Sequence, residues 1–184
     1  IPMSEFLKRS EGEGFTKSRY LEILKTHDII AQQPMVSPHS QALDYCFYHI
    51  SEDLHTLENV VHDLYPDYDE AFKKVIYKCN KPRGFNMMVS SWSIFDNYAK
   101  WLFDILFEVE RRVDISSYSP SQKRIFGYMG ERLLSVYIEK NRLKVYNSKA
   151  LLISDFVADE VSDLYYMIRR AKANLSFKLS LGRS

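Results

Sequence analysis

Apolar side chains recur every three or four positions across residues 92–112, a period that gives the strongest helix prediction in the chain. The apolar positions on one wide face of this helix are Trp92, Phe95, Ala99, Leu102, Phe103, Leu106 and Val109. Charged side chains follow at four-residue spacing on the other face, at Asp96, Lys100, Asp104 and Glu108. We therefore expect the apolar face to be buried and the charged face to contact water.

A second amphipathic helix is predicted over residues 51–64. Ser51 is its candidate N-cap, and Glu52 and Asp53 fall in the first turn, where the helix dipole favours acids. The apolar side chains expected to form its buried stripe are Leu54, Leu57, Val61 and Leu64. The break "YPDYD" separates this helix from a short one over residues 69–78.

Shorter patterns complete the predicted fold. Further helices are expected within "RYLEILKTHDIIA", over residues 120–141 and over about 156–172, with short strands at residues 28–31, in "GFNMMVSS" and in "LKVYN". The strand in "GFNMMVSS" reads as buried, and the two prolines of "QQPMVSPHS" predict an extended loop. Residues 1–20 are polar and contain glycine, as in a loop or flexible lead-in. The pattern predicts a helix-rich α/β or α+β fold.

Charge and cysteine content narrow the class of protein. The net charge is +1, yet residues 39–72 carry eight acids and no Lys or Arg, whereas residues 122–149 carry seven bases and two acids. The basic segment could face an anionic partner, or the opposite charges could meet within the fold. Two cysteines outside any paired motif, and no apolar run of membrane-spanning length, predict a cytoplasmic protein. Nucleic-acid binding is not expected, because no known basic and aromatic motif is present.

The stretch "SPSQKRIFGYMGERLL", residues 119–134, combines helix signals with helix breakers. Ser119 is a candidate N-cap and Pro120 suits the first helical position. Gly127 and Gly130 nevertheless each cost about 1 kcal/mol relative to alanine in a helix. Two costly glycines directly before Glu131 indicate either close packing or close approach of a ligand.

Residues 85–145, from "FNMMVSSWSIFDNYAKWLF" to "GYMGERLLSVYIEKNRLKV", closely resemble the C-terminal half of a bacterial glycosyltransferase-like family. That family is found in capsular and exopolysaccharide gene clusters and is catalogued mostly as a domain of unknown function. The upstream segments "YLEILKTHDIIA" and "YHISEDLHTLENVVHDLYPDYDEAF" resemble it in the same order. The resemblance extends over about residues 20–146. It implies a Rossmann-like sheet and transfer of a sugar from a nucleotide donor.

The resemblance also implies an organisation of the chain. We expect a lead-in over residues 1–20, a glycosyltransferase-like C-terminal domain over residues 21–150 and a basic helical tail over residues 151–184. The first strands and the His-Tyr-Arg-Arg segment of the family's N-terminal half are not found here. The chain is therefore expected to hold the acceptor-side part, and the activity of this part alone stays an open question.

Six residues are candidates for the site. Glu131 is the candidate general base, because transferases of this class need a carboxylate to deprotonate the acceptor hydroxyl. The candidates for substrate binding are His49, Asn86, Gln122, Arg124 and Gly127. An Asn amide can bond sugar hydroxyls, a His can donate to a sugar or phosphate oxygen, and an Arg can hold a phosphate or carboxylate. Each could instead have a structural role, such as an ion pair of Arg124 with a neighbouring helix.

Two metal-like patterns carry less weight. The D-x-D of Asp67 and Asp69 resembles a Mg²⁺ or Mn²⁺ motif, but Asp69 is also a good helix N-cap, and capping is the preferred interpretation. His55, Glu58 and His62 share one flank of their helix without a fixed third ligand and are expected to be exposed polar residues. No metal site is predicted, while Mg²⁺ or Mn²⁺ accompanying a nucleotide-sugar donor stays an open question.

The C-terminal "YYMIRRAKANLSFKLSLGR" is basic and amphipathic. It could rest on the anionic inner membrane surface, where a lipid-linked acceptor would be found, or dock on its own domain. The leading hypothesis is therefore a glycosyltransferase of capsular or exopolysaccharide biosynthesis, acting on a nucleotide sugar and a lipid-linked or oligosaccharide acceptor. The alternative is a non-catalytic binding or scaffold module of the same assembly machinery.

Overall fold

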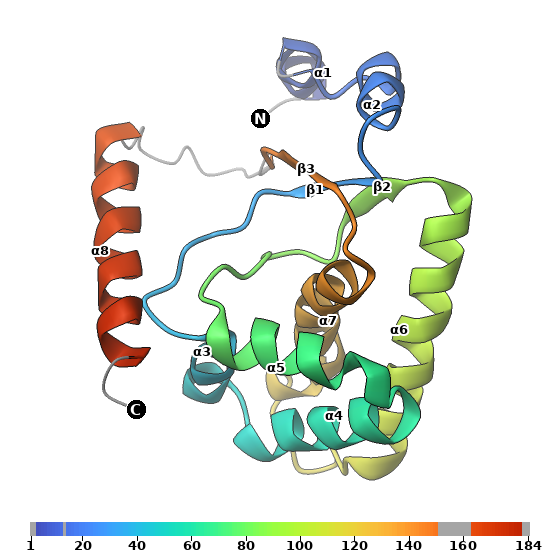
Figure 1. The fold of residues 1–184 in the computed structure, drawn as a ribbon, viewed down its shortest axis with the longest axis vertical. Coiled ribbons are helices and arrows are strands. Elements are labelled where there is room, and N and C mark those ends of the chain that lie inside the picture. Colours follow the sequence, from blue (N-terminus) through green and yellow to red (C-terminus); the bar gives the residue numbers. More distant parts are fainter. Residues whose placement is uncertain (1–2, 13, 151–162, 182–184) are drawn as a thin grey trace.

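A computed structural model describes residues 3–12, 14–150 and 163–181 of the chain (Figure 1). The α-helices of these residues are α1 (Met3–Gly12), α2 (Lys17–Ile23), α3 (Gln41–Tyr48), α4 (Ser51–Leu64), α5 (Asp69–Lys78), α6 (Trp92–Arg112), α7 (Ile125–Asn141) and α8 (Asp163–Leu181). Two 3₁₀ turns, Pro66–Tyr68 and Gln122–Arg124, precede α5 and α7. The strands are β1 (Ile29–Gln32), β2 (Met88–Ser90) and β3 (Val145–Ser148). The predicted helix-rich α/β class is confirmed.

The three strands form one mixed sheet in the order β2-β1-β3. β1 pairs antiparallel with β2, with Ile30 opposite Val89, and parallel with β3, with Ile30 opposite Tyr146. The strand predicted in "GFNMMVSS" is present, but its predicted burial is wrong. β2 lies at an edge of the sheet, where Val89 is 39% exposed.

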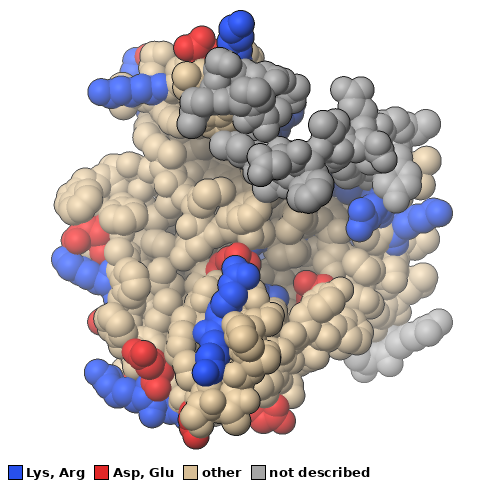
Figure 2. Space-filling view, turned by 180° about the vertical axis from the view of Figure 1, so that it is seen from behind, with Lys and Arg blue, Asp and Glu red and all other residues tan. Residues whose placement is uncertain are grey.

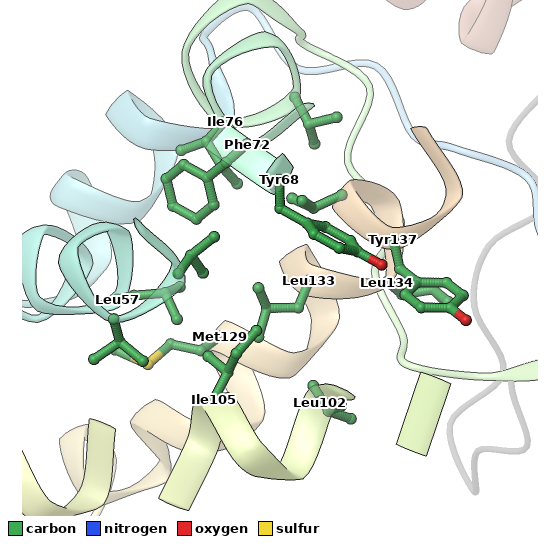
Figure 3. Packing of buried hydrophobic residues seen from close by; sticks show 14 of the residues in the cluster. Leu57, Tyr68, Phe72, Ile76, Leu102, Ile105, Met129, Leu133, Leu134 and Tyr137 are labelled. Carbon is green, nitrogen blue, oxygen red and sulfur yellow. The ribbon is translucent and has the colours of Figure 1, made fainter. Parts of the chain in front are cut away.

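The core lies between the helices below the sheet, with α7 in the middle (Figures 1 and 3). Met129 and Leu133 of α7 lie between α4 and α5 on one side and α6 on the other. The side chains with no exposed surface include Leu57, Val60, Ile76, Ile105, Met129 and Leu133. Burying a side chain of this size contributes about 1.5–3 kcal/mol each. This packing fixes the rotation of α7 and thereby the direction in which its remaining faces point.

The bounds of α6 match the prediction, but the face assigned to the core is only partly buried. Trp92 is 76% exposed and Phe103 is 51% exposed, whereas Tyr98, Trp101 and Ile105 are buried instead. Aromatic and aliphatic side chains surround most of the circumference of α6, so their period does not define one inward face. The space-filling view accordingly shows a wide uncharged area on the side where α6 and β2 lie (Figure 2).

Helix α4 confirms the predicted bounds and corrects two details. Its N-cap position is Ile50 rather than Ser51, and Leu64 is 43% exposed at the C-terminal end instead of buried. Asp53 lies in the first turn as predicted, but it is buried and accepts a hydrogen bond of 2.8 Å from the Tyr118 hydroxyl. That bond fastens the loop before α7 to the start of α4.

The predicted loop over residues 1–20 is wrong, because α1 and α2 form there. The Thr16 hydroxyl accepts a hydrogen bond from the Arg19 amide and caps α2. Gly14 connects the two helices at φ 78°, a left-handed conformation that glycine adopts without strain. Both helices lie on the side of the sheet away from the core (Figure 1).

The two C-terminal helix predictions need corrected bounds. The Ser119 hydroxyl accepts a hydrogen bond from the Gln122 amide, but Ser119 is not a helix N-cap. A 3₁₀ turn with Ser121 at its N-cap comes first, and α7 begins at Ile125 and not at Pro120. The last helix, predicted over about 156–172, is α8 at Asp163–Leu181, and residues 151–162 lie outside the described part. Among the described residues of α8, Ala173 and Phe177 are buried.

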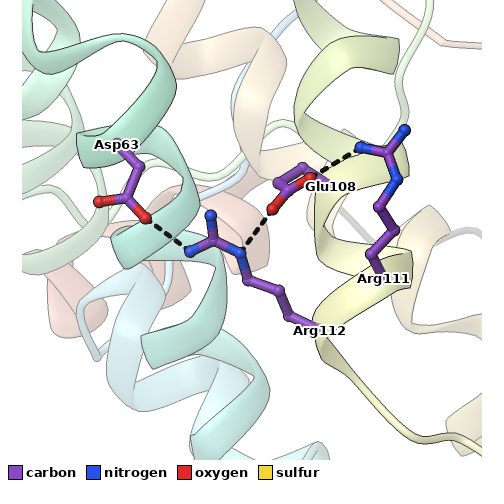
Figure 4. A network of polar contacts seen from close by, with 4 residues as sticks. All are labelled: Asp63, Glu108, Arg111 and Arg112. Carbon is purple, nitrogen blue, oxygen red and sulfur yellow. Dashed lines mark hydrogen bonds and ion pairs between the residues drawn. The ribbon is translucent and has the colours of Figure 1, made fainter.

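A polar network joins the ends of α4 and α6 on the surface (Figure 4). Arg112 donates to Asp63 at 2.6 Å and to Glu108 at 2.8 Å, and Arg111 donates to Glu108 at 2.7 Å. Within the described residues, the acidic segment 39–72 and the basic segment 122–149 meet in the ion pair of Lys140 with Asp67 at 2.8 Å. Two other bases of the segment, Arg124 and Arg132, instead lie over aromatic rings.

Candidate functional site

A hollow of about 440 Å³ opens between α6, α7 and the segment that leads into β2. Its walls are mostly apolar, with Asn86 and Glu131 as the polar members. The lining residues are Phe85, Asn86, Met87, Leu102, Phe103, Leu106, Phe126, Gly127, Gly130 and Glu131. We call this hollow the Glu131 pocket. It brings together three of the predicted site residues: Asn86, Gly127 and Glu131.

The two glycines of α7 have different roles in this pocket. A Cβ atom on Gly130 would lie 3.3 Å from the amide nitrogen of Asn86, so the missing side chain lets the segment before β2 approach the helix. A Cβ atom on Gly127 would meet nothing within 4 Å. Gly127 therefore leaves open space in the pocket wall, whereas Gly130 provides packing space.

A hydrogen bond from α6 holds the Asn86 side chain in place. The buried Tyr98 hydroxyl donates a hydrogen bond of 2.6 Å to the Asn86 Oδ1 atom. The Asn86 amide nitrogen lies on the Gly130 side. Because the phenol occupies the carbonyl oxygen, the amide group is fixed in one orientation, with its NH₂ group as the remaining donor.

Glu131 is half-buried at the edge of the pocket. Burial raises the pKa of its carboxyl group above the usual value of 4.5, while the cations of Arg132 and Arg124 lower it. The carboxylate is thus less solvated than an ordinary surface acid, and two guanidinium groups favour its ionised form. A raised pKa in a hollow is what a general base requires.

The remaining predicted residues gather around the ring of Tyr128, on the adjoining face of α7. We call this group the Tyr128 cluster. The His49 ring stacks on Tyr128 with centroids 4.0 Å apart, and the Arg124 guanidinium lies 5.4 Å from the centre of the same ring. The Gln122 amide donates to the Tyr48 backbone oxygen at 3.1 Å, which fixes the turn before α7 against the end of α3.

The six predicted residues therefore form two neighbouring groups and not one cleft. Glu131, Asn86 and Gly127 line the pocket, whereas His49, Gln122 and Arg124 belong to the Tyr128 cluster. His49 is not among the lining residues of the pocket. The two groups are linked electrostatically, because the cation of Arg124 acts on the Glu131 carboxyl group.

Three residues of the Tyr128 cluster were not found from the sequence. Arg132 lies with its guanidinium 4.8 Å from the centre of the Tyr45 ring, and Tyr45 in turn contacts His49 at a centroid distance of 4.8 Å. A usable signal was present, because Tyr128 and Arg132 are four residues apart and therefore lie on one face of the predicted helix.

Side chains of both metal-like patterns form ion pairs or hydrogen bonds with other residues of the protein. Asp67 pairs with Lys140 at 2.8 Å and Asp69 with His62 at 2.6 Å. Asp69 is the first residue of α5 and not its N-cap, which is Tyr68. Glu58 accepts a hydrogen bond from Tyr77. Within the described part of the chain, no group of three or more His, Cys, Asp or Glu side chains could hold a metal ion.

Comparison with solved structures finds a protein with a similar fold. The apo structure of WbbM, a bifunctional glycosyltransferase, is similar with a TM-score of 0.71 and 24% sequence identity. The match covers 81% of this chain and 27% of that chain, so this chain spans about a quarter of the matched structure. The fold is thus one found within a glycosyltransferase.

The family is shown by sequence. The model of the family described as "Domain of unknown function (DUF4422)" matches residues 3–142, and the chain belongs to that family. No curated protein matches the chain. The family range begins within α1, so the segment expected to be a lead-in lies mostly inside it. No helix in the described ranges has the length and apolar character needed to cross a membrane.

Proposed function

We propose that this protein takes part in glycosyl transfer from a nucleotide sugar to a hydroxyl group of a glycan acceptor, in capsular or exopolysaccharide biosynthesis. In this reaction the acceptor oxygen forms a bond to the anomeric carbon and the bond from that carbon to the diphosphate breaks. The acceptor proton passes to Glu131, and the nucleoside diphosphate leaves. The observation that carries the proposal is a half-buried carboxylate beside an oriented amide in a mostly apolar hollow.

Four further residues of the Glu131 pocket support the transfer in this proposal. The Asn86 amide, fixed by Tyr98, binds an acceptor hydroxyl and directs it toward Glu131. Gly127 leaves the space in which the sugar ring lies. Phe85 and Phe103 supply apolar walls of the kind that sugar rings pack against. The fold shared with WbbM supports the reaction class but not a particular sugar or linkage.

The Tyr128 cluster is proposed to contact the donor side of the reaction. His49 and Arg124 supply donors and positive charge next to the pocket, and Gln122 supports the turn that presents them. We propose the same organisation as the sequence predicts, with residues 21–150 as the acceptor-side domain and residues 151–184 as a tail. Residues that hold the nucleoside would then lie largely outside this chain.

The decisive experiment compares Glu131→Gln with Glu110→Gln in a transfer assay that uses the natural gene product. Glu110 is an exposed acid near the end of α6 and gives a matched loss of charge. We expect transfer to fall by about 10²-fold or more in Glu131→Gln, because the proton acceptor is removed, and to stay unchanged in Glu110→Gln. Equal activity of both variants would refute the proposed base.

The alternative, a binding module without catalysis, makes a different prediction. Isothermal titration would then show that a glycan acceptor binds with equal affinity to the native protein and to Glu131→Gln. No nucleotide sugar would be consumed at any Mn²⁺ concentration. The exposed aromatic side chains of α6 are the observation that favours this second candidate, since such surfaces often bind partners.

We also propose that α8 rests on an anionic membrane surface at the cytoplasmic face. Ile168, Leu175 and Leu179 are exposed on the side of α8 opposite the buried Ala173 and Phe177. Lys172 and Lys178 flank this outer stripe on the helix surface. Co-sedimentation with anionic vesicles, but not with neutral ones, is expected, and the double change Leu175→Gln, Leu179→Gln should abolish it.

A further inference from the structure

Arg132 carries a positive charge that the described residues do not neutralise. Its guanidinium lies over the Tyr45 ring, and its Nη1 atom donates to the Tyr128 backbone oxygen at 2.8 Å. Its Nε atom is buried and without a hydrogen-bond partner among the described residues, and Arg132 forms no ion pair with any of them. Burial lowers the pKa of this guanidinium. A cation withdrawn from water without a counter-charge is costly to the folded state.

Further polar atoms next to Arg132 also lack partners. The Nδ1 atom of His49, the hydroxyl of Tyr45 and the hydroxyl of Ser135 are buried and make no hydrogen bond within the described chain. Tyr45 contacts both His49 and the Arg132 guanidinium, and Ser135 lies one helical turn after Arg132. Buried polar groups in folded proteins are nearly always bonded, so a concentration of unbonded ones indicates a missing partner.

The charges around this group indicate that the missing partner is an anion. Arg124 lies on the same side of α7 and contacts the Tyr128 ring, which adds a second guanidinium. The nearest carboxylates, those of Asp44 and Glu131, act on Arg132 only through longer-range attraction and form no ion pair with it. Two guanidinium groups, a phenol and an imidazole together are a donor set that suits phosphate, because the planar fork of Arg matches its oxygens.

We propose that Arg132, with Arg124 and His49, binds a phosphoryl group of a ligand whose reacting end lies at Glu131. The inference rests on the proposed function for the reacting end, while the anion site itself stands on the unpaired Arg132. A phosphate or diphosphate there would neutralise Arg132 and leave Glu131 free as the base. The phosphate could belong to the nucleotide of a sugar donor or to the lipid diphosphate of an acceptor, and both present the same chemistry.

The first test is a calorimetric titration of the full chain with inorganic pyrophosphate. We expect saturable binding that weakens as ionic strength rises. Arg132→Gln should bind about tenfold to a hundredfold more weakly, since it loses charge-assisted hydrogen bonds, and Arg132→Lys should lie between. Arg19→Gln, an exposed arginine on α2, is the matched control and should bind as the native protein does. Absence of pyrophosphate binding to the native chain, or equal affinity of all variants, would overturn the proposal.

A second readout needs no variant and separates binding from folding. Burial and the cation of Arg132 lower the pKa of His49, against the Gln122 side chain and the carboxylates of Asp44 and Asp53, which raise it. An anion bound at Arg132 should raise the pKa of His49, which NMR can follow from the ring signals with and without pyrophosphate. An unchanged His49 titration under saturating pyrophosphate would place the anion elsewhere and refute the site.

Two further ligands distinguish the sources of the phosphate. A nucleoside diphosphate that competes with pyrophosphate and binds more tightly indicates the donor, and an alkyl diphosphate that does so indicates the acceptor. In either case Arg132→Gln must weaken the tighter ligand. Failure of the proposed function is seen separately, because Glu131→Gln would then keep its transfer activity while pyrophosphate binding persists.

Discussion

Gly130 lies directly against Asn86, and a Cβ atom in place of its hydrogen would come within 3.3 Å of the Asn86 amide nitrogen. The absence of a side chain at one position of α7 thus sets the place of a polar group on another segment. Gly127, one turn earlier, faces open space instead. Two glycines that cost the helix the same amount therefore have separate consequences for the site.

Gly127→Ala should stabilise the protein and impair binding. The methyl group meets no atom within 4 Å, so the helix gains about 1 kcal/mol of propensity without strain. The same methyl group enters the Glu131 pocket and narrows it. We expect a higher free energy of unfolding in urea, together with weaker binding of a glycan acceptor by calorimetry.

Gly130→Ala provides the comparison. Its methyl group must displace the Asn86 amide, which loosens the bond from Tyr98, so the gain in helix propensity is offset. We expect a smaller stability gain than in Gly127→Ala, or a loss, and weakened acceptor binding. If Gly130→Ala were the more stable of the two, the packing role assigned to Gly130 would be wrong.

The transfer activity of the natural gene product should fall on the acid side of its pH profile. Burial raises the pKa of Glu131 above 4.5, and a base acts only when ionised, so the midpoint of the acid limb of kcat/KM should lie above 4.5. Arg124→Gln removes a cation that lowers this pKa, so the limb should move to higher pH. If the acid limb of the Arg124→Gln profile stayed at the same pH, Arg124 would not be lowering the pKa of Glu131.

Tyr118→Phe tests the buried carboxyl group of Asp53. Burial raises the pKa of Asp53 above its usual 3.8, and the Tyr118 hydrogen bond lowers it. Because the pKa of Asp53 is higher in the folded than in the unfolded protein, the free-energy cost of burying its charge is absent below pH 3.8. This cost develops as the pH rises through the folded pKa. Loss of the phenol hydroxyl should therefore cost about 1–3 kcal/mol at pH 7 and less at pH 3.8. Urea unfolding at the two pH values gives both numbers, and an equal loss at both would contradict this assignment.

The D-x-D segment should prove irrelevant to divalent cations. Asp67 and Asp69 are engaged by Lys140 and His62 rather than by each other. We expect the double change Asp67→Asn, Asp69→Asn to leave any Mg²⁺ or Mn²⁺ dependence of nucleotide-sugar binding unchanged. A lost metal requirement in the double variant would show that these aspartates bind the cation after all.

The sequence predicted the bounds of the helices better than it predicted which of their side chains are buried. The bounds of α4, α5 and α6 follow from period and turn residues, since both are local properties. The inward face of α6 does not, because Tyr98 and Trp101 are as apolar as Phe95 and Phe103, and only packing against α4 and α7 decides between them. Leu64 was misassigned because a helix end extends past the surface that buries its middle.

Local sequence patterns likewise did not predict which candidate site residues lie together, because packing decides it. Asn86 and Glu131 are 45 residues apart in sequence, and their presence around one pocket follows from the packing of the segment before β2 on Gly130. Arg132 was missed because a guanidinium without a counter-charge is recognisable only when its surroundings are known. The resemblance to a family gave the position of Glu131, and residue spacing alone did not.

The order of the sheet has a consequence for any shortened version of this protein. The family range ends at residue 142, yet β3 at Val145–Ser148 is the parallel neighbour of β1, and the Lys144 backbone amide donates a hydrogen bond of 2.6 Å to the Asp28 carboxylate. A fragment cut at residue 142 would therefore leave one side of β1 as a row of bare N–H and C=O groups. Such an edge invites strand addition from other molecules. The few residues beyond the family range thus complete the hydrogen bonding of the central strand.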